Sequence, residues 1–215
     1  DLSAEAFIRL LQTEFSPRVF VCGEDFRFGA GAKGNPEILQ SMDGVHAEVL
    51  PLVEIDGEKV SSGTVKKYLT KGDVERANVL LGENFFLLGE VVDGRQVGRT
   101  IGFPTANILY PKEKLPLKTG VYETRIRLNG DTYRGITNYG NRPTFDDDAL
   151  LTETYLDGFS GDLYGKTLKI EFVRYLRDIR KFDDADGLKK QLQTDVERVR
   201  DNDGNDGKRG GTKDD

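Results

Sequence analysis

"GVYETRIRLNGDTYRGIT", residues Gly120 to Thr137, has two runs rich in β-branched and aromatic residues on either side of Asn129-Gly130. An Asn-Gly pair accepts the positive φ angles of a two-residue hairpin turn, so the segment predicts two antiparallel strands. Short runs of the same texture lie before and after it, namely "FFLLGEVV", "TETYLD" and "TLKIEFVRYL". From Phe85 onward we therefore predict an antiparallel sheet or a small barrel.

A helix is expected after these strands. Its apolar stripe, at helical spacing, consists of Leu188, Leu192, Val196 and Val199. Asp183 or Asp184 could cap its first turn, and the stripe should lie against the barrel. Residues 201–215 alternate Asp, Gly, Asn and Lys without apolar side chains, which predicts a disordered tail.

The first part of the chain has a different pattern. "DLSAEAFIRLLQTEF" predicts an amphipathic helix capped by Ser3, and "RVFVC" predicts a strand that opens into the glycine-rich loop "GEDFRFGAGAKG". A second helix with Asn35 as its cap and a strand within "VHAEVLPLV" follow. Helix and strand in alternation indicate an α/β unit.

Two short helices are predicted between Val60 and Gly82, with Ser62 and Asp73 as their caps. The fold class is therefore α+β. We expect a partial α/β domain at residues 1–81, a β-rich domain with a final helix at 82–200, and the tail beyond.

Composition excludes several classes of function. The net charge of -6 argues against broad affinity for nucleic acid, which needs a basic surplus. No apolar run approaches the roughly 20 residues that cross a bilayer. The lone cysteine, Cys22, forms no internal disulfide and is compatible with a reducing cytoplasm. We expect a cytoplasmic protein that binds neither nucleic acid nor membrane.

"GRTIGFPTAN", residues Gly98 to Asn107, is unusual for a core or a helix. Gly98 and Gly102 allow the backbone to approach a ligand, while Thr105 offers a hydroxyl to a hard cation and Asn107 a neutral amide. These groups suit a phosphate and magnesium site. Alone, however, such a cluster between two strands is more often a simple turn.

The motifs that follow give this stretch its context: "GITNYGNRPTF", "TETYLDGFSGDLYGK" and "YLRDIRKFDDADGLKKQLQTDVERVR". From about Gly82 to Arg200 the chain resembles the riboflavin kinase module of the bacterial bifunctional riboflavin kinase/FMN adenylyltransferases, also called prokaryotic FAD synthetases. The resemblance implies a Greek-key-type β-barrel with a C-terminal helix. It also implies a complete kinase module that uses ATP and Mg²⁺ to phosphorylate riboflavin to FMN.

The resemblance further implies roles for particular residues. Thr105 would bind magnesium and Asn107 would lie at the ATP phosphates. Glu153 would be the general base that takes the proton from the 5'-hydroxyl of riboflavin, which fits a phosphoryl transfer that needs mainly positioning and charge neutralisation. The residues expected to bind the nucleotide, the metal or the flavin are Gly98, Gly102, Pro104, Thr105, Asn107, Asn138 and Arg177.

Two mobile segments are also implied: a flap at Asn138 to Phe145 near the nucleotide, and a loop at Leu176 to Phe182 that closes over the flavin. The second departs from the family, because Ile179 stands where an acidic residue is usual soon after Leu-Arg-Asp. Any role of that acid in loop closure is therefore in doubt here.

"GEDFRFGAGAKGN" resembles the adenylyltransferase module of the same enzymes, which is Rossmann-like and makes FAD from FMN and ATP. Its His-x-Gly-His loop is absent, since the single histidine, His46, lies in a predicted strand. Lys66 replaces the arginine of its second motif and cannot grip phosphate in the same bidentate way. We expect an N-terminally truncated module that does not adenylylate FMN by itself and whose half-sheet exposes an edge.

A second function remains open at this point. The chain could be a non-catalytic flavin-binding or regulatory fragment, a possibility suggested by Ile179 and by the truncated first module. A Glu153→Ala variant separates the two, because it abolishes kinase turnover but changes nothing in a protein that only binds. The sequence leaves the oligomeric state open.

Overall fold

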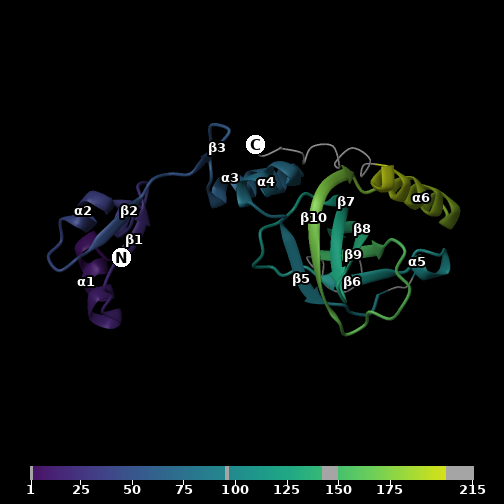
Figure 1. Ribbon diagram of the computed structural model, residues 1–215, viewed down its shortest axis with the longest axis horizontal. Coiled ribbons are helices and arrows are strands. Elements are labelled where there is room, and N and C mark those ends of the chain that lie inside the picture. The colour runs from purple at the N-terminus through teal and green to yellow at the C-terminus, as the bar shows by residue number, and fades with distance from the viewer. Residues whose placement is uncertain (1, 95–96, 142–149, 202–215) are drawn as a thin grey trace, which may run out of the picture. The chain divides into compact units, whose positions relative to one another are not determined.

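The computed structural model describes residues 2–94, 97–141 and 150–201. The predicted disordered tail lies outside these residues from position 202 onward, as does the part of the expected flap after Asn141. The chain divides into two compact units, residues 1–60 and 61–215 (Figure 1).

The first unit consists of helices α1 and α2, a 3₁₀ turn and two pairs of strands. Their bounds are α1 Ala4–Phe15, β1 Phe20–Gly23, η1 Ala30–Ala32, α2 Pro36–Gln40, β2 Ala47–Leu50, β3 Glu54–Ile55 and β4 Glu58–Lys59. The predicted caps are confirmed: the Ser3 side chain accepts from the backbone N–H of Ala6, and that of Asn35 accepts from Ile38. β1 and β2 pair in parallel, as an α/β unit requires.

Within the described residues of this unit, helices α1 and α2 cover one face of the two-stranded sheet. Phe20, Cys22 and Ala47 pack with the apolar side chains of α1 and α2. On the opposite face Val21 and Leu50 are exposed.

The second unit begins with α3 Ser62–Lys71 and α4 Val74–Leu81. Asp73 caps α4 as predicted, whereas α3 is capped by Ser61, not by Ser62, because Ser62 already has helical geometry. Both helices attach to the barrel: Asn78 Nδ2 donates to the carbonyl of Phe172 over 2.9 Å, and the carbonyl of Leu69 accepts from the N–H of Lys118 over 2.9 Å. For this reason the compact units divide at Val60, earlier than the domain boundary expected at 81–82.

Six strands form an antiparallel, nearly closed barrel. They are β5 Phe86–Glu90, β6 Thr105–Leu109, β7 Gly120–Leu128, β8 Asp131–Asn141, β9 Leu150–Leu156 and β10 Thr167–Arg177. Their order in the sheet is β5-β10-β7-β8-β9-β6. Strands β7 to β9 follow one another and β10 returns beside β7, which is the Greek-key arrangement. The predicted fold class is thus confirmed, including the Asn129-Gly130 hairpin turn with positive φ at both residues.

Alternate side chains of these strands point into the barrel. Tyr122, Ile170 and Phe172 are fully buried there, with the Tyr122 and Phe172 rings edge to face. Beside them, three buried threonine hydroxyls on neighbouring strands are linked: Thr124 to Thr137 over 2.8 Å and Thr137 to Thr154 over 2.9 Å. Strands β7, β8 and β9 are therefore tied together by side chains as well as by backbone.

The outer face of the sheet is covered by α6 Ala185–Asp201, drawn in yellow in Figure 1. Its Leu192, Val196 and Val199 pack against Val121, Ile136 and Leu176, as the apolar stripe predicts. Of the two candidate caps it is Asp184 that accepts from the N–H of Gly187, over 2.7 Å. A short helix, α5 Val97–Thr100, precedes β6. None of the helices within the described ranges combines the length and apolarity needed to cross a membrane.

Candidate active site

The pairing of strands brings three of the predicted site residues into one row. Asn107 on β6 pairs with Glu153 on β9, and Glu153 pairs with Asn138 on β8. Because paired residues in a sheet point to the same face, all three side chains lie on the outer face, on the side that α6 covers. Positions far apart in the sequence thus form one continuous polar strip.

A second row of paired residues lies on the same face, two positions away along each strand. There Thr105 pairs with Tyr155, and Tyr155 pairs with Ile136. Tyr155 stacks at a tilt on Phe103, with ring centroids 4.9 Å apart, and burial raises the pKa of its phenol. Tyr155 therefore stays neutral and supplies an apolar wall with a polar tip beside the strip.

Both rows line one cavity of about 570 Å³, which the loop after β10 and the start of α6 complete. The predicted residues that line it are Gly98, Thr105, Asn107, Asn138, Glu153 and Arg177. The other walls are mainly apolar and include Phe103, Tyr155, Phe182 and Leu192. A cavity of this size, apolar with a few convergent polar groups, is typical of a small-molecule site.

Within the strip, Asn138 Nδ2 donates to Glu153 Oε2 over 3.3 Å. The Oδ1 atoms of Asn107 and of Asn138 are buried, and neither has a hydrogen-bond partner among the described residues. An unpartnered buried acceptor is costly in a folded protein. The two oxygens are therefore suited to groups that a ligand or a cation brings into the cavity.

Two glycines near the site, Gly94 and Gly98, occupy positions where a larger side chain would overlap a neighbouring group. A Cβ on Gly94 would overlap the side-chain amide of Asn107, so Gly94 makes room for that side chain. A Cβ on Gly98 would overlap the carbonyl oxygen of Phe103, whose N–H donates back to the Gly98 carbonyl over 2.7 Å. Gly98 thus closes the turn that precedes β6. Gly102 has a φ of +86°, and no atom within 4 Å would meet a Cβ there.

Gly102 and Pro104 do not line this first cavity among the described residues. Pro104 instead lines a second cavity of about 610 Å³, and Thr105 is in the lining of both cavities. The loop from Phe159 to Tyr164 forms a large part of the lining of the second cavity. No site residue is predicted from the sequence in this loop, although its segment "FSGDLYG" carries two aromatic residues and two glycines that could have marked it.

Arg177 is the last residue of β10 and stands on the wall of the first cavity, with its side chain 12% exposed. The next residue, Asp178, is exposed and accepts from the hydroxyl of Tyr175 over 2.5 Å. That hydrogen bond and the ammonium of Lys118, 3.0 Å away, lower the pKa of the Asp178 carboxyl. The start of the expected flavin loop is therefore fixed by the contacts of Asp178 with Tyr175 and Lys118.

Ile179 follows in the same loop and lines the cavity. Its side chain lies over the backbone of Gly140 on β8, where a Cβ would be 2.7 Å from Ile179 Cδ1. The residue that departs from the family pattern thus makes an apolar contact between the loop and the end of β8.

Comparison with known proteins gives consistent matches. The family model described as riboflavin kinase matches residues 81–202, and that described as FAD synthetase matches residues 1–64. The bifunctional riboflavin kinase/FMN adenylyltransferase of Haemophilus influenzae is 35% identical over 202 residues, which cover 92% of this chain and 65% of the relative. The enzyme of the same name from Mycoplasma pneumoniae is 33% identical, with 93% and 71% covered.

Among solved structures, one described as a macrolide-efflux protein from Streptococcus pneumoniae is similar with a TM-score of 0.79 and 32% identity. The match covers 93% of this chain and 66% of that one. The chain spans about 65% of the length of the first curated relatives that it matches.

Proposed function

Because the chain belongs to the family of bifunctional riboflavin kinase/FMN adenylyltransferases, with its riboflavin kinase region at residues 81–202, we propose that it phosphorylates riboflavin. The γ-phosphate of ATP is transferred to the 5'-hydroxyl of the ribityl chain, and FMN and ADP are the products. The observation that carries the proposal is the polar strip Asn107, Glu153 and Asn138 in one cavity with Thr105.

Glu153 serves as the general base in this proposal. Its half-buried carboxylate lines the cavity and is oriented by the side-chain amide of Asn138. It accepts the proton of the 5'-hydroxyl while that oxygen bonds to the γ-phosphorus and the bond between this phosphorus and the oxygen of ADP breaks. Phosphoryl transfer needs little covalent help, so one oriented carboxylate is sufficient on the protein side.

The residues present fit a magnesium ion. Mg²⁺ prefers oxygen ligands and is usually held by a few protein groups together with substrate phosphates. Thr105 offers a hydroxyl and Asn107 an unpartnered buried Oδ1 on neighbouring pleats of β6. No group of three His, Cys, Asp or Glu side chains suited to a metal occurs in the described parts of the chain, so the phosphates of ATP would supply the remaining ligands. When bound, the ion would neutralise phosphate charge.

The two cavities suit the two substrates. The first holds Glu153 and apolar and aromatic walls, which suit a flat flavin ring. The second, with Phe159 and Tyr164 in its wall, suits the nucleoside part of ATP. Thr105 lines both, which supports placing the transferred phosphate at this residue.

The test is an assay of FMN formation from riboflavin, ATP and Mg²⁺ with the purified chain, run beside Glu153→Gln. We expect turnover by the wild type and a loss between about a hundredfold and ten-thousandfold in the variant. Riboflavin binding, followed by quenching of flavin fluorescence, should be retained in both. Riboflavin binding without FMN formation in the folded wild type would instead support the non-catalytic flavin-binding alternative.

We also propose that this chain does not convert FMN to FAD by itself. The basis is the sequence: His46 is the single histidine and Lys66 stands in place of the arginine expected there. FAD formed from FMN and ATP by the purified chain would contradict this part of the proposal. We further propose that the two functional modules are residues 1–81 and 82–200, since the riboflavin kinase match begins at residue 81. This boundary lies after helices α3 and α4, whereas the compact units divide at Val60.

A further inference from the structure

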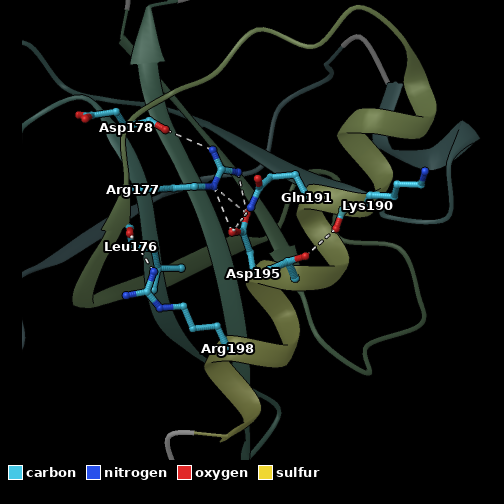
Figure 2. A network of polar contacts seen from close by, with 8 residues as sticks. Leu176, Arg177, Asp178, Lys190, Gln191, Asp195 and Arg198 are labelled. Atoms are coloured by element: carbon cyan, nitrogen blue, oxygen red, sulfur yellow. Dashed lines mark hydrogen bonds and ion pairs between the residues drawn. The ribbon is translucent and has the colours of Figure 1, made fainter.

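The guanidinium of Arg177 forms an ion pair with Asp195 of helix α6 (Figure 2). Its Nε donates to both carboxylate oxygens of Asp195, at 3.0 and 3.1 Å, and its Nη2 donates to Asp195 Oδ2 over 2.6 Å. Its Nη1 donates to the carbonyl oxygen of Asp178 over 3.2 Å. The plane of the guanidinium is therefore fixed by contacts on two sides.

Asp195 is itself buried and fixed. The residue is 3% exposed, and Gln191, one turn earlier on α6, donates from Nε2 to Asp195 Oδ1 over 3.0 Å. Both oxygens of the carboxylate thus have donors. Figure 2 shows Gln191 and Asp195 side by side on the helix, facing Arg177.

Helix α6 also packs on the barrel through apolar side chains. The helix already buries Val196 and Val199 against the sheet, with Leu192 beside them. A buried pair of charges costs desolvation, and apolar side chains of similar volume often stabilise a protein equally well. Stability alone therefore does not require a charged pair at this position, and Arg177 lines the cavity that holds Glu153.

The guanidinium keeps donors for a ligand. Of its five N–H groups, one each on Nε, Nη1 and Nη2 takes part in the contacts above. One N–H on each terminal nitrogen has no partner among the described residues. Arg177 lines the same cavity as Glu153, so these groups are suited to an acceptor oxygen of the bound substrate.

We propose that Asp195, supported by Gln191, is a positioning residue that orients the guanidinium of Arg177 toward an acceptor oxygen of the flavin substrate. This inference rests on the proposed function, and it deepens it by making α6 part of the flavin site. The acceptor in this proposal is a carbonyl oxygen of the flavin ring, which riboflavin and FMN share. A carbonyl contact affects riboflavin and FMN alike, whereas a phosphate contact affects FMN alone.

The test compares Asp195→Asn and Gln191→Leu with Arg200→Gln as a matched control. Arg200 forms a similar two-point ion pair between α6 and the barrel, with Asp157, and does not line the cavity among the described residues. We expect Asp195→Asn to raise the riboflavin KM about tenfold and Gln191→Leu about threefold, with the ATP KM within about twofold. The control should leave both KM values within about twofold.

A double-mutant cycle separates positioning from a purely structural role. If Asp195 acts through Arg177, the added effect of Asp195→Asn on the riboflavin KM disappears in an Arg177→Met background. An effect that persists in that background, or an Arg200→Gln variant with the same change in KM, would overturn the proposal.

Binding measurements keep the two proposals distinguishable. If the wild type forms no FMN, the proposed function fails, and the same variants are then compared by quenching of riboflavin and FMN fluorescence. Weaker flavin binding in Asp195→Asn, but not in Arg200→Gln, would still support the positioning role. Equal binding in all variants would refute it.

Discussion

Asn138 and Glu153 occupy directly paired positions on β8 and β9, and the Asn138 amide donates to Glu153 Oε2 over 3.3 Å. The carboxylate thus obtains its orientation from a neighbouring strand and not from a flexible loop. Such orientation matters in a general base, because proton transfer requires the acceptor within hydrogen-bond reach of the hydroxyl.

Replacement of Asn138 by Ala should lower kcat for FMN formation about tenfold, since Glu153 would sample orientations that do not face the hydroxyl. The riboflavin KM should change less than kcat. Thr132→Ala, on an exposed position of the same strand, is the control and should match the wild type. An unchanged kcat in Asn138→Ala would show that Glu153 is oriented without this hydrogen bond.

Gly94→Ala should disturb the proposed metal site without altering any ligand. The added methyl group would overlap the Asn107 amide and displace it. We expect the Mg²⁺ concentration for half-maximal activity to rise several-fold, as it would in Asn107→Ala. Gly63→Ala, where a Cβ meets only Ser61 Oγ at 3.8 Å, serves as the comparison. A normal Mg²⁺ dependence in Gly94→Ala would argue against Asn107 as a ligand.

Gly140→Ala should displace the loop at Leu176 to Phe182 and weaken riboflavin binding. Its new methyl group would press against Ile179 Cδ1, the far end of a side chain that can move, so the loop shifts while the barrel remains intact. The expected result is a riboflavin KM raised about threefold with a melting temperature close to that of the wild type. Ile179→Ala removes the same contact and should give a similar KM. If neither substitution changes KM, the loop does not contribute to flavin binding.

Thr137→Val should destabilise the barrel. The substitution removes a fully buried hydroxyl that bonds both Thr124 and Thr154, and it leaves their hydroxyls without this partner. We expect the free energy of unfolding to fall by about 1–3 kcal/mol in urea denaturation. Thr132→Val, on the exposed part of β8, should change it by less than about 0.5 kcal/mol.

Much of this fold could be predicted because its signals are local. Alternation and the Asn129-Gly130 turn predict the β7–β8 hairpin, and the apolar stripe from Leu188 predicts α6. Strand β6 was not predicted, because its five residues are preceded by glycine and proline and include polar side chains. Ser61 and Ser62 are equally good caps in sequence, and backbone geometry alone separates them.

The site was predicted less completely. The resemblance points to Thr105, Asn107 and Glu153, but whether they lie together depends on which strands pair and in which register, and no local pattern fixes either. The hydrogen bond from Asn138 to Glu153, the role of Asp195 and the second cavity all result from contacts between distant segments. Residue types alone do not indicate such contacts.

The polar strip also has a consequence for the order of events during folding. Asn107 reaches Glu153 only when β6 pairs with β9, across a separation that includes the whole β7–β8 hairpin. We expect contacts between such distant segments to form late, because they require the entropy of the intervening chain to be lost first. A partly folded barrel therefore has no binding site. Substrate added during refolding should leave the folding rate unchanged and slow the unfolding of the finished barrel.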